Sequence, residues 1–160
     1  MISFSVIIPA YNEEALLAET IAEIRRGMDD LLPIAGEIIV VDNNSVDRTP
    51  KIATNAGARV VFEPINQISR ARNSGAREAK GKYFFFVDAD TVVPFPLLKK
   101  SLSLMIAGEI GAGGSTLRFD SKLPEGSLDH FLPIFGTGFP VLFVWQPGAL
   151  SFVEGKPLSP

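Results

Sequence analysis

The hydrophobic positions of the chain follow two alternating patterns. Short runs rich in Val, Ile and Phe, bounded by Pro, Gly or charged residues, are typical of buried strands. They lie at 4–10, 37–42, 58–63 and 82–88. Longer segments carry apolar residues every three or four positions, as on one face of a helix. They lie at 12–28, 48–57, 68–81 and 96–108. This alternation predicts an α/β fold with a mostly parallel sheet and helices on both faces.

Two of the helical segments carry further signals. The first, 12–28, places Glu13 and Glu14 in its first turn, where the helix dipole favours negative charge. This supports a helix that starts directly after the first strand. The third, 68–81, contains Gly75, which weakens a helix interior and counts against the assignment.

The pattern loosens after about residue 109. A strand entered through a glycine turn is expected within 110–119. We expect one domain, in which 1–120 is regular and 121–160 is irregular, apolar and rich in Pro and Gly. The apolar stretch 131–145 is interrupted by Pro and Gly and is too short for a membrane-spanning helix. Core packing, peripheral membrane association and homo-oligomer formation are all open for it.

The composition narrows the class of protein. Hydrophobic residues make up 46% and charged residues 21% of the 160, which is ordinary for one globular domain. A net charge of −3 and an isoelectric point near 5.2 argue against nucleic-acid binding, which needs a basic face. The absence of cysteine excludes disulfides and thiolate metal sites. The start of the chain lacks the basic region of a signal peptide. We therefore expect a cytoplasmic protein.

Polar side chains follow three of the four expected strands at the point where each strand ends. They lie at 11–13, at 42–45, and at Asp88 and Asp90. The carboxyl ends of parallel strands meet at one edge of a sheet, where ligands bind in open α/β folds. We therefore expect these residues to form one site.

Asp88 and Asp90 are the most informative of these residues. The run before them, 83–87, is apolar or aromatic without alternation, which predicts a central strand buried on both faces. Two carboxylates at the end of such a strand repel each other unless a cation lies between them. The alternative is a turn with two solvated acids. Oxygen ligands without His or Cys suit Mg²⁺ or Mn²⁺. Such an ion commonly bridges to phosphate, so the pair indicates a metal site and a diphosphate substrate.

Several other polar residues have two interpretations each. Asp42 is either a turn former or an acceptor for a ribose hydroxyl or a base N–H. No G-x-G-x-x-G motif follows the first strand, which argues against the usual dinucleotide fold. Arg70, Arg72 and Arg77 are either solvated or available to phosphate, and at helical spacing only Arg70 and Arg77 share a face. His130, the only histidine, is either structural or a metal ligand or base.

Three motifs occur in order along the chain: SVIIPAYNEE (5–14), EIIVVDNNSVDRT (37–49) and ISRARNSGAREAKGKYFFFVDADTVVP (68–94). Together they resemble family 2 glycosyltransferases, inverting enzymes with a GT-A fold. The resemblance covers roughly residues 3 to 120. It implies a UDP- or GDP-linked sugar as donor, Mg²⁺ or Mn²⁺ as cofactor, and a saccharide, lipid or protein as acceptor. It also implies that 1–120 is the half that binds the nucleotide sugar, with an incomplete acceptor side in 121–160.

The resemblance assigns roles by position. The residues that would line the nucleotide pocket are Pro9, Tyr11, Glu13, Asp42 at the base, Asn44 in the same turn, Arg72 and Asn73. Asp88 would be the acid on the ribose or metal side of a D-x-D motif, and Asp90 the direct metal ligand.

The chain departs from the family pattern at its C-terminal end. Members carry a later GGFDE-like stretch and an acidic pair that supplies the catalytic base, and nothing in 147–160 matches either. Asp129 and Glu154 are candidates for the base by elimination only. The chain is then a fragment, a shortened enzyme, or a donor-binding domain completed by another chain.

Two rival functions follow from the same residues. One is a domain that binds a nucleotide sugar, or assembles with other proteins, without turnover. The other is a phosphatase of the haloacid-dehalogenase type, in which Asp88 would be the nucleophile and Asp90 the acid–base.

Overall fold

The computed structural model describes residues 2–91, 93–115 and 142–145. Its strands are β1 (Phe4–Ala10), β2 (Gly36–Asp42), β3 (Arg59–Phe62), β4 (Tyr83–Val87), β5 (Ala112–Ser115) and β6 (Leu142–Trp145). Its helices are α1 (Leu17–Asp29), α2 (Thr49–Asn55), α3 (Ile68–Glu78) and α4 (Phe95–Ile106). The elements from β1 to α4 alternate between strand and helix, as the sequence predicts.

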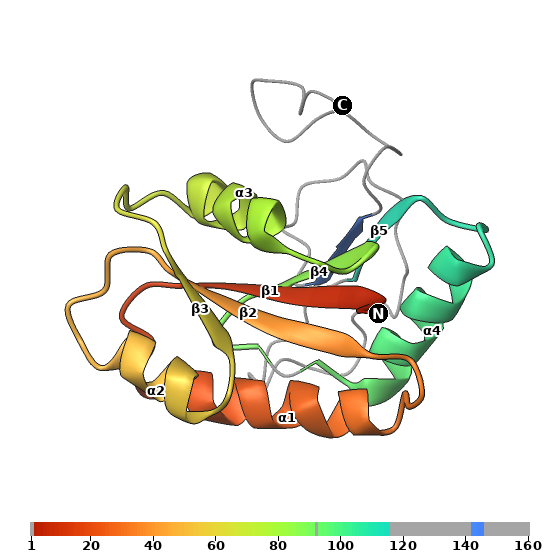
Figure 1. Cartoon of the computed structure of the whole chain (residues 1–160), viewed down its shortest axis with the longest axis horizontal. Coiled ribbons are helices and arrows are strands. Elements are labelled where there is room, and N and C mark those ends of the chain that lie inside the picture. Colours follow the sequence, from red (N-terminus) through yellow and green to blue (C-terminus); the bar gives the residue numbers. More distant parts are fainter. Residues whose placement is uncertain (1, 92, 116–141, 146–160) are drawn as a thin grey trace, which may run out of the picture.

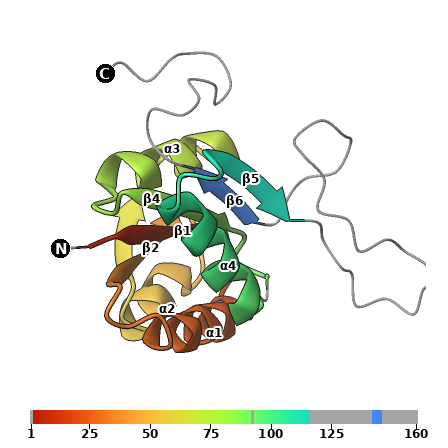
Figure 2. The same cartoon turned by 90° about the vertical axis from the view of Figure 1, so that its right-hand side faces the viewer.

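The strands form one sheet in the order β3-β2-β1-β4-β6-β5. β1 pairs in parallel with β2 and β4, and β2 pairs in parallel with β3. β6 is antiparallel to both of its neighbours, β4 and β5. Helices α1 and α2 lie on one side of the sheet and α3 on the other (Figures 1 and 2). The predicted mostly parallel sheet with helices on both faces is therefore confirmed.

Two apolar clusters hold the layers together, and β1 contributes to both. Phe4, Val6 and Ile8 face the larger cluster, which also contains the buried sides of α1 and α4. Ile7 points to the opposite side of the sheet and packs with Ala71 of α3. β1 is buried along its whole length because it has a strand on each side and helices on both faces.

Gly75 lies inside α3 for a steric reason. A Cβ atom added at this position would come within 2.8 Å of Val41 Cγ2 and would also collide with Ile7 Cγ2. The glycine thus lets α3 lie close against β1 and β2. A glycine inside a helix is about 1 kcal/mol less favourable than an alanine, and the close packing of α3 on the sheet offsets this cost.

The expected start of the first helix is wrong. α1 begins at Leu17, and Glu13 and Glu14 lie in the preceding loop, not in a first helical turn. The backbone of Asn12 has a φ of 56°, outside the helical region, so the helix cannot include this residue. The backbone N–H groups of Glu13 and Glu14, which precede the helix, donate to the side chains of Thr49 and Asp47.

The last two strands refine the expectations for the C-terminal part. β5 occupies the middle of the strand expected within 110–119. β6 forms from the end of the apolar stretch 131–145 and inserts between β4 and β5. The remainder of that stretch lies outside the described residues, as does most of 121–160. Within the ranges given above, none of the helices is long and apolar enough to cross a bilayer.

A polar network closes the edge of the sheet formed by the amino ends of the strands. Glu37 of β2 accepts hydrogen bonds through Oε1 from Ser5 Oγ at 2.8 Å and from the backbone N–H of Lys80 at 2.6 Å. Its Oε2 pairs with Arg59 Nη2 of β3 at 3.2 Å. Burial opposes ionisation of Glu37, but these three donors outweigh it and lower the pKa below its usual 4.5.

We expect Glu37→Gln to lower the free energy of unfolding at neutral pH by about 2 kcal/mol, because Arg59 loses a charged partner in a mostly buried site. A lowered carboxyl pKa stabilises the fold above the unfolded-state value and ceases to do so as the pH falls through the folded-state value. The difference between wild type and variant should therefore shrink below about pH 4.5. Urea unfolding across this range measures it.

Glu78→Gln is the matched control, because Glu78 pairs with the same arginine at 3.3 Å but has an exposed side chain. It should cost less than about 1 kcal/mol at neutral pH. Equal losses for the two variants would contradict a special role for Glu37.

Candidate functional site

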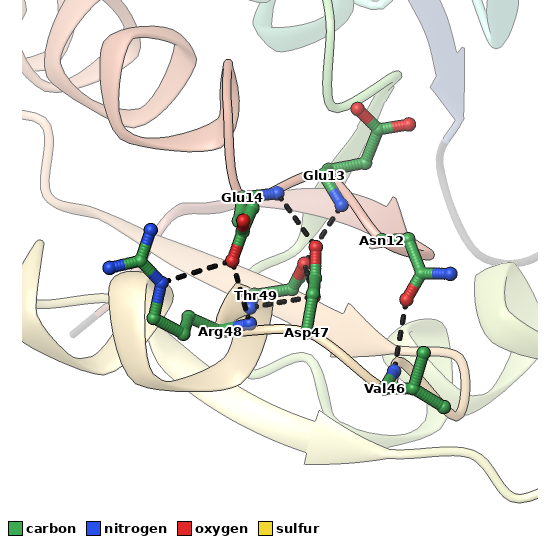
Figure 3. Close-up of polar contacts among 7 residues, drawn as sticks. All are labelled: Asn12, Glu13, Glu14, Val46, Asp47, Arg48 and Thr49. Atoms are coloured by element: carbon green, nitrogen blue, oxygen red, sulfur yellow. Dashed lines mark hydrogen bonds and ion pairs between the residues drawn. The ribbon is translucent and has the colours of Figure 1, made fainter.

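The loop after β1 and the loop after β2 are joined by reciprocal hydrogen bonds at the carboxyl edge of the sheet (Figure 3). Val46 N–H donates to Asn12 Oδ1 at 2.9 Å, and Glu13 N–H donates to Thr49 Oγ1 at 2.8 Å. Glu14 N–H donates to Asp47 Oδ2 at 3.2 Å. These bonds fix the two loops relative to each other and so define one wall of the candidate site.

Asp42 is the last residue of β2 and belongs to this wall of the candidate site. Only 5% of its surface is exposed, and its Oδ1 accepts a hydrogen bond from Ser45 N–H at 3.0 Å. The turn-forming interpretation of Asp42 is thus realised. The bond involves Oδ1 and is compatible with a second acceptor role for the carboxylate. Asn44 lies in the same turn with a φ of 66° and is exposed.

Asp88, Ala89 and Asp90 form a turn directly after β4. Ala89 is only 4% exposed and packs into the larger apolar cluster, whereas Asp90 is exposed and Asp88 partly so. The alanine thus anchors the turn in the core, while both acids reach the surface. Thr91 N–H donates to the Asp88 carbonyl at 3.2 Å and closes the turn.

The two aspartates of this turn have different partners. Arg72 of α3 donates from Nη2 to Asp88 Oδ1 at 3.0 Å, in a pair whose side chains are about one third exposed. Within the described part of the chain, Asp90 has one long hydrogen bond, 3.5 Å, from the hydroxyl of its neighbour Thr91. Asp88 is therefore already neutralised in part by Arg72, whereas among these residues Asp90 has no cationic partner.

Of the three arginines on α3, Arg72 is the one that pairs with the D-x-D turn. Arg70 is bonded to Gln67 at the start of the helix, and Arg77 to Ser74 of the same helix. Both are exposed. Asn73, the other α3 residue assigned by sequence, is half-buried beside Arg72. This agrees with the expectation that Arg72 points away from the face shared by Arg70 and Arg77.

The first wall also contributes negative charge. Burial, followed by the nearby charges of Asp90 and Asp47, raises the pKa of Glu13 above its usual value. Figure 3 shows its carboxylate directed away from the hydrogen-bonded loop cluster. Glu13 and Asp90 come from loops that follow different strands, so the fold brings together acids 77 positions apart in sequence. The remaining residues assigned to this edge are Pro9, buried in β1, and Tyr11, which is exposed.

The donor set fits a hard divalent cation that is only partly held by protein. Mg²⁺ and Mn²⁺ take oxygen ligands, and Mg²⁺ usually keeps several waters or substrate phosphates. Asp90 supplies free carboxylate oxygens, and Asp88 lies beside it. Among the residues described, no group of three or more His, Cys, Asp or Glu forms a complete cage. A cation at this turn would therefore need phosphate or water to complete its coordination.

A buried polar group beside the site was missed at the sequence level. Glu63 follows β3 and accepts hydrogen bonds from Ser74 Oγ at 2.6 Å and from Ile65 N–H at 3.1 Å, which together lower its pKa. Asn43 donates its side-chain amide to the carbonyls of Glu63 and Ile65. These bonds position the loop between β3 and α3. The signal was available, because Glu63 is also a polar residue at the end of an apolar run.

His130 and the two candidates for the catalytic base, Asp129 and Glu154, lie outside the described residues. The described residues therefore contain an acidic turn and two hydrogen-bonded loops, both at the carboxyl edge of a mostly parallel sheet.

The sequence and the fold of the chain match known proteins. The sequence model of the family "Glycosyl transferase family 2" matches residues 5–152 of this chain. The hexosyltransferase Agl6 of low-salt glycan biosynthesis in Haloferax volcanii is 34% identical over 128 residues, covering 79% of this chain and 30% of that protein. TarS from S. aureus superposes with a TM-score of 0.70 at 20% identity, over 91% of this chain and 47% of the TarS chain. It has also been solved with UDP-GlcNAc.

A third similarity is to the mannosyltransferase PcManGT from Pyrobaculum calidifontis, solved with GDP-Man and Mn²⁺. Its TM-score is 0.62 at 26% identity, over 72% of this chain and 35% of that one. The fold is thus that of the GT-A glycosyltransferases. Within this class, the chain belongs to glycosyl transferase family 2. It spans about a third to a half of the length of these relatives.

Proposed function

We propose that the carboxyl edge of the sheet binds a nucleotide-diphosphate sugar, UDP- or GDP-linked, and that the protein transfers the sugar to a hydroxyl of a saccharide, lipid or protein acceptor. The observation that carries this proposal is the D-x-D turn, in which Arg72 holds Asp88 while Asp90 remains available. Membership of the family supports it, as do the UDP-GlcNAc and GDP-Man complexes of the structural relatives.

The nucleoside half of the donor is assigned to the wall made by the loops after β1 and β2. Asp42 would accept from the base through the oxygen that Ser45 does not use, and Tyr11 offers an exposed ring beside it. Pro9, Asn44 and Asn73 complete the assigned pocket. The rigid connection between the two loops would present these groups to the nucleoside with little further ordering.

The diphosphate half is assigned to the D-x-D turn. Asp90 would be the direct ligand of Mg²⁺ or Mn²⁺, with Asp88 on the ribose or metal side and Glu13 nearby. When bound, the ion would offset negative charge on the departing nucleoside diphosphate. Arg72 would orient Asp88 and add a fixed positive charge near the phosphates.

The transfer itself is a displacement at the anomeric carbon. The acceptor hydroxyl oxygen forms a bond to this carbon as the bond to the diphosphate oxygen breaks. The hydroxyl proton passes to a carboxylate base, and the nucleoside diphosphate leaves with the bonding electrons. We assign no residue of this chain to the base.

A binding domain without turnover is a second candidate. It is favoured by the hydrogen bonds and the ion pair that three acids at the described edge already make. Asp42 is bonded to Ser45, Asp47 to Thr49 and Asp88 to Arg72, so none of these three is placed as a free proton acceptor. The phosphatase alternative, with Asp88 as nucleophile, has the weaker support, because the family match favours a transferase.

Titration with UDP and with GDP, each in the presence and absence of Mn²⁺, tests the binding step. We expect one of the two nucleotides to bind, and Mn²⁺ to tighten its binding, because the ion links Asp90 to the diphosphate. Failure of both nucleotides under both conditions would end the transferase and the binding-domain proposals together.

Two further measurements separate the candidates once binding is established. Hydrolysis or transfer of sugar from a UDP- or GDP-sugar pool distinguishes an enzyme from a binding domain. Trapping of covalent phosphate on Asp88 would replace both with the phosphatase.

A further inference from the structure

Thr20 makes a hydrogen bond that its position in the helix does not require. It lies on the buried side of α1, with 3% of its surface exposed, among Leu17, Ile21 and Ile24. A threonine inside a helix commonly returns its hydroxyl to a carbonyl one turn earlier. Thr20 Oγ1 instead donates at 2.7 Å to the carbonyl oxygen of Ala89, 69 positions away in the middle residue of the D-x-D turn.

The Ala89 carbonyl lies where the sheet cannot supply a partner. The ladder between β4 and β1 ends at Phe86, and the ladder between β4 and β6 ends at Val87. Ala89 is two residues further on and buried against the apolar cluster. A buried carbonyl without a donor costs about 1–3 kcal/mol. The Thr20 hydroxyl removes this cost without adding a charge to the core.

The bond also fixes the direction of the following residue. The carbonyl of Ala89 shares a rigid peptide plane with the nitrogen and the Cα atom of Asp90. The hydrogen bond from the Thr20 hydroxyl to this oxygen therefore limits rotation of the peptide plane. It also limits the direction in which the Asp90 side chain leaves the backbone. Arg72 of α3 holds the other aspartate directly through its side chain. The two acids are thus oriented from opposite faces of the sheet, by α1 and by α3.

We propose that Thr20 is a positioning residue for Asp90, acting through the Ala89 carbonyl. This inference rests on the proposed function in so far as Asp90 is a ligand of the metal–nucleotide complex. Thr20 itself does not contact substrate or metal. Its part is to hold the turn in one orientation before the ligand arrives, so that little ordering remains when the ion binds.

Thr20→Val tests the proposal, because valine keeps the branched shape and removes the donor. Supporting residues around metal ligands typically contribute about tenfold or more in metal affinity. We expect the Mn²⁺ concentration for half-maximal nucleotide binding to rise by about this factor, with binding in the absence of metal unchanged. Thr20→Ser keeps the donor and should restore the wild-type value. Thr54→Val is the matched control, because it removes a threonine hydroxyl bonded to a carbonyl within α2, on the surface.

Hydrogen–deuterium exchange provides a readout that does not depend on ligand binding. The backbone amide of Thr91, which donates to the Asp88 carbonyl, should exchange faster in Thr20→Val than in wild type, and at the wild-type rate in Thr20→Ser and Thr54→Val. If Thr20→Val fails to fold, Thr20→Ala removes the same donor with less bulk in the core. The serine variant then still separates loss of the hydroxyl from loss of volume.

Two outcomes would overturn the proposal. One is a Thr20→Val variant with wild-type exchange at the turn and wild-type Mn²⁺ dependence. The other is a Thr20→Ser variant as impaired as Thr20→Val, which would assign the effect to packing and not to the donor. If the wild-type chain binds neither nucleotide, the proposed function fails, while the exchange rates still decide whether Thr20 holds the turn.

Discussion

Asp90→Asn is expected to abolish most of the tightening of nucleotide binding that Mn²⁺ produces. Asparagine keeps the shape of the side chain and one oxygen, but it removes the negative charge that attracts the ion. Among the described residues, Asp90 is the acid of the turn without a cationic partner, so its charge is directed to the ion and not to an arginine. We expect the affinity in the presence of Mn²⁺ to fall by about tenfold or more, since even supporting residues of metal sites contribute this much. Isothermal titration with and without the ion measures it.

Asp42→Asn provides the comparison within the same pocket. Its Oδ1 position can still accept from Ser45 N–H, so the turn is preserved, while a base N–H loses a charged acceptor. Binding should therefore weaken with and without Mn²⁺, by a smaller factor than in Asp90→Asn when the ion is present. Asp30→Asn, an exposed change of the same charge at the end of α1, should alter neither quantity. Unchanged Mn²⁺ dependence in Asp90→Asn would remove Asp90 from the metal site.

Stability separates this result from a folding defect. Asp90 is exposed, so its replacement should change the free energy of unfolding by less than about 0.5 kcal/mol. A large loss of stability would mean that the charge supports the turn itself.

Gly81→Ala, which adds one methyl group, is expected to lower the free energy of unfolding more than the other substitutions proposed for this protein. The added Cβ atom would come within 2.6 Å of both Phe4 Cα and Ser5 N, and these are backbone atoms that cannot rotate away. Either β1 or the segment before β4 must shift, and β1 is the central strand that both apolar clusters share. The hydrogen bond from Gly81 N–H to Ser5 Oγ would be strained as well. We expect a loss of about 3 kcal/mol in the free energy of unfolding, measured by urea denaturation.

Gly108→Ala is the control for this experiment. Gly108 has a φ of 74° and no atom within 4 Å of an added Cβ, so its replacement tests backbone strain alone. That strain is worth about 1 kcal/mol. A smaller loss for Gly81→Ala than for Gly108→Ala would show that the contact with β1 relaxes easily.

The two edges of the sheet differ in their polar groups, and we assign ligand binding to the carboxyl edge alone. At the amino ends of the strands, Glu37 and Ser5 connect the segment between α3 and β4 to β1 and β2 through hydrogen bonds. At the carboxyl ends, Asp42 and Asp88 have partners, and among the described residues Asp90 has no cationic one. α3 extends between the two edges and carries Arg72, so its position on the sheet contributes to both.

The alternation of strands and helices could be predicted because periodicity is a local property. Apolar runs and three-to-four spacing follow from the backbone geometry of strands and helices. The meeting of Asp42, Glu13 and Asp90 at one edge then followed from the parallel arrangement alone. The limits of the elements were harder to predict, as the start of α1 shows, because the left-handed backbone of Asn12 belongs to a loop held by the distant residues Ser45 and Val46. β6 is a short apolar run between prolines, but its place between β4 and β5 could not be predicted, since its pairing depends on residues far away in the chain.

The sequence by itself determined the fold class and the residue types at the site, because both depend on local pattern and on the direction of parallel strands. Only the tertiary structure decided which of the paired aspartates is held by Arg72 and which is available. It also showed that Thr20 of α1 donates a hydrogen bond to the carbonyl of Ala89, which lies between the two aspartates. These contacts join residues 16 and 69 positions apart. Spacing along the chain does not encode such distances, which are set by how closely α1 and α3 pack on the two faces of the sheet.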